Sequence, residues 1–155
     1  MSIDTGPVRL QGTMPYLFML PLMIGGLAEN FIPTKLFPTI ISIVIGTFFC
    51  LLSIPIIILA LREFYKAKII FDARKASTTL ITTSIYKITR HPVYLSLILF
   101  YIGLSFLINS IWMLVMLVPA IYFIQKFSVE REEKLLEVKY GEEFQIYKAS
   151  VRRWI

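Results

Sequence analysis

The longest early run without a charged residue extends from Leu36 to Leu61 and contains 26 residues. About 20 apolar residues are enough for a helix to cross a bilayer. A second uncharged run, Pro92 to Gln125, contains 34 residues, which is too long for one span of ordinary length. Because Asn109 and Ser110 divide this run, we expect a tight hairpin of two short spans, extended by flanking residues.

An earlier apolar run, Met14 to Pro33, is interrupted only by Glu29 and Asn30 near its end. Hydrophobic residues make up 57% of the chain, above the roughly 45–50% that is usual for soluble domains. The sequence therefore predicts an all-α integral membrane fold with about four transmembrane helices. No short apolar core with a small-residue cleavage site follows the N-terminal residues, so we expect the first span to be retained.

Basic residues are concentrated in two regions, between the second and third spans and after the fourth. Short loops rich in Lys and Arg stay in the cytoplasm, so we expect both regions and both termini on the cytoplasmic side. Of sixteen Lys and Arg residues, the fourteen in these regions are Arg62, Lys66, Lys68, Arg74, Lys75, Lys87, Arg90, Lys126, Arg131, Lys134, Lys139, Lys148, Arg152 and Arg153.

We expect the whole chain, residues 1–155, to form a single membrane domain. Its predicted parts are two N-terminal spans (1–61), a cytoplasmic middle loop (62–91), a helical hairpin (92–127) and a cytoplasmic C-terminal segment (128–155). The net charge of +6 is explained by this topology and by attraction to anionic lipid headgroups. The expected partner is therefore the lipid bilayer and not a nucleic acid. One His and one Cys, far apart in the sequence, argue against a metal site.

The middle loop changes character along its length. Its first part alternates charged residues with Phe64, Tyr65 and other apolar residues, as expected of a helix that leaves the membrane and lies along the interface. Ser77 to Ser84 is polar and rich in β-branched residues, which favour an extended or turning chain. We therefore expect the loop to fold back towards the bilayer.

The segment Arg90-His91-Pro92-Val93-Tyr94 lies where the chain returns to the membrane. Pro92 suits the first turn of a helix, because its missing N–H would have no partner within the helix. If the helix extends back to Arg90, then Arg90 and Tyr94 share one face. Two interpretations stay open at this point. The segment forms part of a ligand site, or Arg90 snorkels to headgroups and Tyr94 belongs to an interfacial aromatic belt.

The fourth span continues without a helix-breaking residue as far as Gly141. At α-helical spacing, Glu133 interrupts a largely apolar stripe, and Glu132 points about a third of a turn away. A carboxylate on an apolar face needs a hydrogen-bond donor, which a ligand or another side chain would supply. Glu130 precedes Lys134 by four residues, as in an ordinary surface pair. The predicted stripe consists of Tyr122, Lys126, Val129, Glu133, Leu136 and Tyr140.

The residues after Gly141 predict an amphipathic C-terminal helical segment. Gly141 itself is expected to end the preceding helix in a left-handed cap. Glu142 and Glu143 then suit a helix N-terminus, where the dipole favours acidic residues. We interpret this segment as lying on the membrane, with Trp154 as an anchor. It either covers a site or serves only as a basic anchor.

The second half of the chain contains four short motifs. They are Arg-His-Pro-x-Tyr at 90–94, Glu-Glu-Lys-Leu-Leu at 132–136, Tyr-Gly-Glu-Glu-Phe-x-x-Tyr at 140–147 and Val-Arg-Arg-Trp at 151–154. Their order and spacing resemble those of the integral-membrane methyltransferases grouped with isoprenylcysteine carboxyl methyltransferase and phospholipid N-methyltransferases. The resemblance covers roughly residues 80–155, and Ser84, Ile85 and Ser96 stand where the family commonly has glycine, proline and glycine.

The resemblance implies an S-adenosylmethionine-dependent methyltransferase whose cofactor lies at the cytoplasmic ends of the last two spans, under the C-terminal segment. Carboxylates would accept hydrogen bonds from the cofactor's amino group and hydroxyls, and aromatic rings would attract its sulfonium. The implied cofactor-binding residues are His91, Tyr94, Glu132, Glu133 and Tyr147.

The implied catalytic residues are Arg90, His91 and Arg152. Either arginine would hold an anionic acceptor or a phosphate headgroup, and His91 or a carboxylate would serve as a base where the acceptor must lose a proton. No metal is implied.

The methyl acceptor is expected to be lipophilic or membrane-associated. An isoprenylcysteine-type carboxylate, which needs no base, is the first expectation, and a phospholipid amine or a small thiol is the alternative. The competing class is a non-enzymatic membrane protein that binds anionic lipid or a partner subunit. That class predicts no saturable binding of S-adenosylmethionine.

Overall fold

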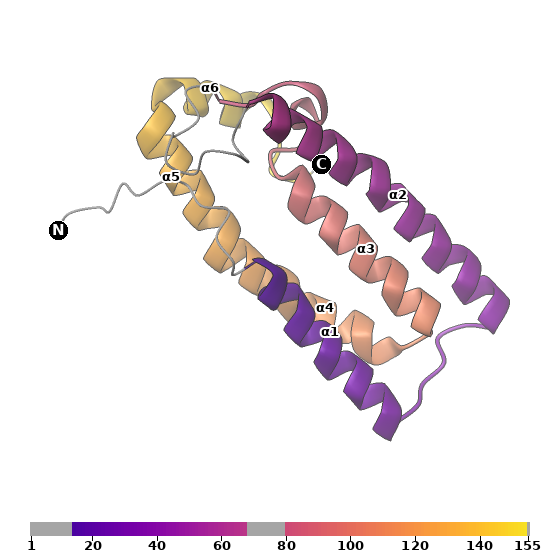
Figure 1. Cartoon of the computed structure of the whole chain (residues 1–155). Coiled ribbons are helices and arrows are strands. Elements are labelled where there is room, and N and C mark those ends of the chain that lie inside the picture. The colour runs from indigo at the N-terminus through magenta and orange to yellow at the C-terminus, as the bar shows by residue number, and fades with distance from the viewer. Residues whose placement is uncertain (1–13, 68–79, 155) are drawn as a thin grey trace.

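The computed structural model describes residues 14–67 and 80–154. In these ranges the chain forms helices and no strand, which confirms the predicted all-helical class. Four long helices lie side by side, with α2 packed on α3 and α1 packed on α4 (Figure 1). They are α1 (Met14–Phe31), α2 (Thr39–Lys66), α3 (Pro92–Ile108) and α4 (Ile111–Ile124). Helix α3 begins at Pro92 as predicted, so Arg90 lies outside the helix and not on its first turn.

Two helices are long and apolar enough to cross a membrane. They are α2, with 28 residues, and the continuous helix Ile111–Tyr140, with 30 residues. The 18 residues of α1 and the 17 of α3 give lengths of about 25–27 Å at 1.5 Å per residue. This is slightly less than the hydrocarbon core of about 30 Å, a mismatch that local thinning of the bilayer accommodates. The two additional spans stay predictions.

Helices α2 and α3 approach each other closely at a pair of glycines. A Cβ atom on Gly46 would lie 2.8 Å from the Gly103 carbonyl oxygen, and a Cβ atom on Gly103 would lie 2.5 Å from Cys50 Sγ and 2.9 Å from the Gly46 carbonyl oxygen. Small residues at such a crossing allow two helix backbones to make close van der Waals contact, which favours association within a membrane. Cys50 is therefore part of this helix contact.

The turn between α3 and α4 is fixed by Asn109, which adopts the left-handed conformation with φ 59° and ψ 41°. Its Oδ1 accepts hydrogen bonds from Leu36 N at 3.0 Å and from Ser42 Oγ at 2.8 Å. Its Nδ2 donates to the Phe37 carbonyl at 2.8 Å. One side chain thus joins the hairpin to the link between α1 and α2.

Asn109→Ala should destabilise the protein by about 1–3 kcal/mol, because it leaves polar groups of the α1–α2 link without their partner. Asn109→Gly also removes the side chain but keeps the left-handed backbone conformation accessible. Comparison of the two variants therefore separates the effect of the lost side chain from that of backbone strain. Thermal unfolding in detergent measures both, with the exposed Asn30→Ala as the control. Equal melting temperatures for the Asn30 and Asn109 alanine variants would contradict this role.

The fourth helix contains a π-helical turn, η2, at Gln125–Val129 between α4 and α5 (Glu130–Tyr140). Seven of the eleven residues of α5 are charged, so α5 extends beyond the apolar part of this helix. A π-turn holds an extra residue and rotates the helix face. The predicted stripe is therefore wrong for Tyr122 and Lys126, which are exposed. The residues buried along this helix are Met113, Leu117, Ala120, Ile124, Ser128, Val129 and Glu133.

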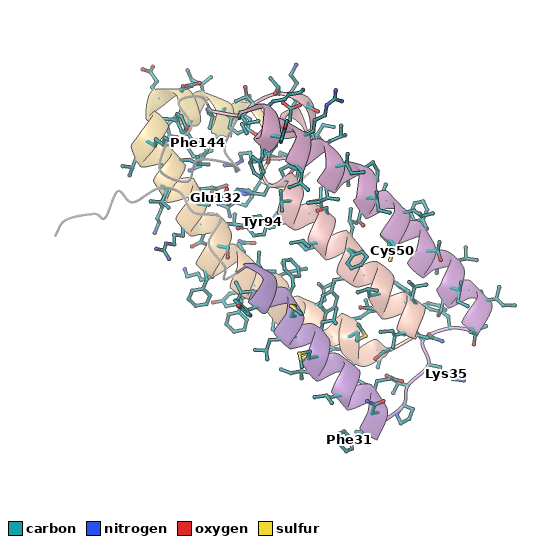
Figure 2. All side chains as sticks on the ribbon, viewed as in Figure 1. Phe31, Lys35, Cys50, Tyr94, Glu132 and Phe144 are labelled. Atoms are coloured by element: carbon teal, nitrogen blue, oxygen red, sulfur yellow. The ribbon has the colours of Figure 1, made fainter. Side chains whose placement is uncertain are left out.

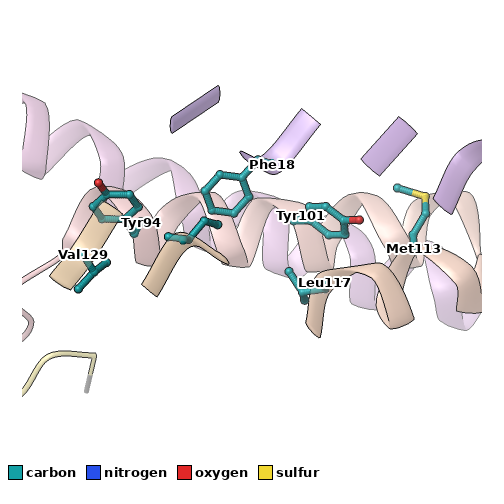
Figure 3. Packing of buried hydrophobic residues seen from close by; sticks show 7 residues of the cluster. Phe18, Tyr94, Tyr101, Met113, Leu117 and Val129 are labelled. Carbon is teal, nitrogen blue, oxygen red and sulfur yellow. The ribbon is translucent and has the colours of Figure 1, made fainter. Parts of the chain in front are cut away.

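The core runs along the inside of the bundle as a row of apolar and aromatic side chains. Two tyrosines of α3 lie between α1 and the fourth helix (Figure 3). Large apolar side chains of α2, such as Val44 and Phe48, are exposed, which suits a helix surrounded by lipid. The labelled members of the core cluster are Phe18, Tyr94, Tyr101, Met113, Leu117 and Val129.

The C-terminal helix α6 (Glu142–Ser150) follows Gly141, where φ is 52° and ψ is −120°. The positive φ confirms the need for glycine, but this ψ lies outside the left-handed helical region, so the predicted left-handed cap is wrong in detail. Phe144 and Tyr147 are buried while Glu142, Glu143 and Gln145 are exposed, which confirms an amphipathic helix. Before α3, a 3-10 helix, η1, occupies Ser84–Lys87, while the first residues of the predicted turning stretch, 77–79, lie outside the described residues.

Candidate active site

Three segments meet at one end of the bundle: the chain leading into α3, helix α5 and the C-terminal segment (Figure 1). Arg90 N donates a hydrogen bond to the Arg152 carbonyl at 3.2 Å. Thr89 Oγ1 donates to the Arg153 carbonyl at 3.0 Å, and the same hydroxyl accepts from His91 N at 3.3 Å. The C-terminal residues Arg152 and Arg153 are thereby hydrogen-bonded to the segment that leads into α3.

Glu133 is the centre of a buried charge cluster, with only 4% of its surface exposed. Its Oε1 lies 2.9 Å from Arg90 Nη1 and 3.2 Å from His91 Nε2. Arg153 binds both carboxylate oxygens, with Nη2 at 2.7 Å from Oε2 and Nε at 3.2 Å from Oε1. The structure therefore brings together Arg90, His91 and Glu133, which the sequence singled out, and adds Arg153.

We expected Arg152 at this site, but Arg153 reaches the carboxylate. The side chain of Arg152 is exposed, and it is the Arg152 carbonyl that contacts Arg90. Val151 has the extended conformation, with φ −125° and ψ 133°, and successive side chains of an extended chain point to opposite sides. An extended tail carrying adjacent arginines was the signal that could have identified Arg153.

A cavity of about 80 Å³ lies beside this cluster. Four predicted site residues line it: Arg90, His91, Tyr94 and Glu132. Tyr94 and Glu132, from α3 and α5, lie close together in Figure 2. Glu133 and Tyr147 are not among the lining residues. The other lining residues, which were not among the predicted site residues, are Phe64, Leu80, Ile81, Tyr86, Pro92, Val93, Leu136 and Tyr140.

Tyr147 and Trp154 do not line the cavity but contact residues that do. The hydroxyl of Tyr147 donates to the Tyr86 carbonyl at 2.7 Å, and burial raises the pKa of Tyr147 to about 12. The Trp154 ring lies 6.4 Å from the His91 ring and packs against the core cluster. Trp154 thus faces the protein interior, where we had expected a membrane anchor.

Several buried polar atoms at the cavity have no hydrogen-bond partner among the described residues: Arg90 Nε, Arg90 Nη1 and Glu132 Oε2. Arg90 Nη1 is close to Glu133 Oε1, at 2.9 Å, but not at a hydrogen-bonding angle. Leaving buried polar groups unpaired costs about 1–3 kcal/mol each. Glu132 Oε2 lies 3.8 Å from His91 Nδ1, beyond hydrogen-bonding distance. The cavity therefore presents a guanidinium and a carboxylate with remaining hydrogen-bonding capacity, and this pair is complementary to a zwitterion.

The neighbouring carboxyls of Glu132 and Glu133 have opposite pKa shifts. Burial raises the pKa of Glu133, but hydrogen bonds from His91 and Arg153 and the charges of Arg90 and Arg153 outweigh burial and lower it to about 2. Burial raises the pKa of Glu132, which the charge of His91 and a hydrogen bond with Tyr94 only partly offset. Glu133 is therefore a fixed anion, and Glu132 is a carboxyl that a cationic ligand would stabilise.

The free energy of unfolding should decrease as the pH falls below 4.5. The folded-state pKa of Glu133, about 2, lies below its ordinary value of 4.5, so its contribution is complete above pH 4.5 and is lost as the pH falls towards 2. The contribution of Glu132 to the free energy of unfolding changes with pH in the opposite direction, because its raised pKa makes ionisation unfavourable above pH 4.5. Melting temperatures measured from about pH 2 to 7 should decrease at the acidic end for the wild type and less for Glu133→Gln. Parallel profiles would contradict the assignment.

Comparisons with known proteins agree with the motifs. An uncharacterized protein of Haemophilus influenzae is 42% identical over 63 residues, a match that covers 41% of this chain and all of that protein. No solved structure matches the chain. A family model described as phospholipid methyltransferase matches residues 41–143, which include α3, α4, α5 and all but the first two residues of α2. Since this match covers more than half of the chain, the protein belongs to the phospholipid methyltransferase family.

Proposed function

We propose that this protein transfers a methyl group from S-adenosylmethionine to a lipophilic, membrane-associated acceptor. The family is one of membrane methyltransferases. The observation that carries the proposal is the cavity between α3 and α5, where Arg90 Nε and Glu132 Oε2 make no hydrogen bond within the described residues. These groups are complementary to the carboxylate and the ammonium of an amino acid, which form one end of S-adenosylmethionine.

The other residues of the cavity suit the rest of this cofactor. The rings of Phe64, Tyr86 and Tyr94 line the cavity, and aromatic faces attract cations such as a sulfonium. Arg90 would hold the cofactor's carboxylate and Glu132 its amino group, while Glu133 keeps Arg90 in place. When bound, S-adenosylmethionine supplies an electrophilic methyl group on a good leaving group.

The contribution of the protein itself is mainly geometric. Holding two reactants in line supplies on the order of 7–11 kcal/mol of barrier reduction. His91 lines the cavity, and its Nε2 lies 3.2 Å from Glu133 Oε1. We propose that His91 accepts a proton from an acceptor that must lose one, with Glu133 orienting the imidazole ring.

An amine on a phospholipid headgroup is the acceptor that we place first, because the description of the matched family names phospholipids as the substrate class. The sequence alone favoured an isoprenylcysteine-type carboxylate. That acceptor stays second, supported by the exposed side chain of Arg152 next to the cluster, since a guanidinium binds a carboxylate as well as a phosphate.

We also propose that both termini and the site lie on the cytoplasmic side. The site lies at the end of the bundle where α2 ends and α5 and α6 follow (Figure 1). These segments, together with the chain leading into α3 and the C-terminal tail, carry most of the described basic residues. Positive loops stay in the cytoplasm. A polar cofactor would then arrive from the cytoplasm, and a lipophilic acceptor would arrive laterally from the bilayer.

Transfer of a labelled methyl group tests the proposal. The protein in phosphatidylethanolamine vesicles is given methyl-labelled S-adenosylmethionine, and parallel samples contain a prenylcysteine or a small thiol. Label in the phospholipid supports the first acceptor, and label in the prenylcysteine alone replaces it with the second. If there is no transfer to any acceptor and no saturable binding, the enzyme proposal fails and the non-enzymatic lipid-binding class takes its place.

A further inference from the structure

Glu63, near the end of α2, is a buried carboxylate with 6% of its surface exposed. Its Oε2 accepts a hydrogen bond from Thr83 Oγ1 at 2.7 Å, and its Oε1 lies 2.7 Å from Lys66 Nζ. The side chain of Lys66 is 57% exposed, so its ion pair with Glu63 is largely solvated. The buried contact of Glu63 is the one with Thr83, twenty positions further along the chain.

Thr83 directly precedes a residue with an unfavourable backbone conformation. Ser84 has φ 56°, in the left-handed region that residues with a side chain rarely adopt. Such a conformation persists only where the surroundings hold it. Glu63 holds the chain just before Ser84, and the Tyr147 hydroxyl holds the Tyr86 carbonyl just after it.

The segment held in this way forms one wall of the cavity. Leu80, Ile81 and Tyr86 line the cavity, and so does Phe64, the residue next to Glu63. The rings of Phe64 and Tyr86 lie 5.9 Å apart. A shift of the turn at Ser84 would therefore change the shape of the cavity.

We propose that Glu63 is a positioning residue for the cofactor cavity. Through its hydrogen bond with Thr83 it holds the strained turn at Ser84, and with it the wall formed by Leu80, Ile81 and Tyr86. This inference rests on the proposed function, because it takes the cavity as the binding site for S-adenosylmethionine. The simpler alternative is that Glu63 only pairs with Lys66, an interaction that is worth little when one partner is exposed.

The two interpretations differ in the KM for S-adenosylmethionine. Thr83→Val removes the hydroxyl and leaves the Glu63–Lys66 pair in place, so we expect the KM to rise by about tenfold, the effect of losing one hydrogen bond to a charged group. The kcat at saturating cofactor should change much less. Lys66→Met is the matched control, which removes only the ion pair and should leave the KM within about twofold.

A second substitution tests whether Thr83 affects the KM through the turn at Ser84. Ser84→Gly makes the positive φ accessible without strain. Added to Thr83→Val, it should reverse most of the increase in KM. If the strained turn transmits the effect to the cavity, relieving its strain lowers the KM again, so absence of rescue contradicts the inference.

Hydrogen exchange gives a measurement that does not depend on the cofactor. In Thr83→Val the amides of residues 84–90 should exchange faster, and those of α4 should not change. Wild-type protein that binds no S-adenosylmethionine overturns the proposed function and the role of Glu63 with it. Saturable binding by the wild type, together with an unchanged KM and unchanged exchange in Thr83→Val, overturns this inference alone.

Discussion

Glu133→Ala should abolish saturable binding of S-adenosylmethionine and, with it, methyl transfer. The substitution leaves the guanidinium groups of Arg90 and Arg153 without the anion that binds them at 2.9 and 2.7 Å. Removing one partner of a buried ion pair costs about 3–5 kcal/mol, which corresponds to more than a hundredfold in affinity if it is expressed in binding. Arg90 would also lose its position at the cavity.

The matched control for this prediction lies on the same helix. Glu130 is 34% exposed, and its Oε2 lies 3.5 Å from Lys126 Nζ, so its surface pair is formed with Lys126, where we had predicted Lys134. Because such pairs contribute about 0–1 kcal/mol, Glu130→Ala should bind the cofactor almost as the wild type does. Isothermal titration in detergent measures both variants. Equal affinities would show that the charge cluster has no part in binding.

Gly103→Val should prevent normal packing of α2 on α3 and lower the melting temperature by about 5–10 °C. Even the first carbon of the new side chain would lie 2.9 Å from the backbone nitrogen of Cys50 and 2.9 Å from the Gly46 carbonyl oxygen. Overpacking of this kind costs about 1–3 kcal/mol, and 1 kcal/mol corresponds to about 2–4 °C in a protein of this size. Backbone atoms cannot rotate away as a side chain can, so we expect the upper part of this range.

Gly26→Val separates this contact from the general effect of a β-branched residue in an apolar helix. A Cβ atom on Gly26 has no atom within 4 Å outside its own helix. The melting temperature of the Gly26→Val variant should therefore stay close to that of the wild type. Equal decreases for the two variants, measured by differential scanning fluorimetry in the same detergent, would show that close contact at Gly103 is not what stabilises the helix pair.

The positions of the helices could be predicted because charge and helix-breaking residues are costly inside a membrane. The run from Leu36 to Leu61 became α2, which starts after Pro38 and continues to Lys66. Asn109 and Ser110 separate α3 from α4, and Pro92 begins α3. In each case a single residue type decides where a helix can begin or end, so local sequence is sufficient.

The contacts between helices could not be predicted in the same way. Nothing in the spacing of Gly46 and Gly103 shows that they face each other, because that depends on which helices pair. The choice of Arg153 over Arg152 depends on the direction in which an extended tail approaches α5. Glu63 has no motif around it that marks it, and its proposed role depends on Thr83, a partner that only the folded chain brings near.

The π-turn at Gln125–Val129 sets the rotation of the buried face of α5 relative to the buried face of α4. Before it, the buried face of the helix has to fit other apolar helices; after it, the buried face has to present carboxylates to Arg90 and His91. One residue corresponds to about 100° of rotation in an α-helix. Deleting one residue from the turn would leave the apolar half in register and rotate Glu132 and Glu133 away from their partners. The apolar half and the charged half can therefore vary in sequence independently, provided that the number of residues between them is kept.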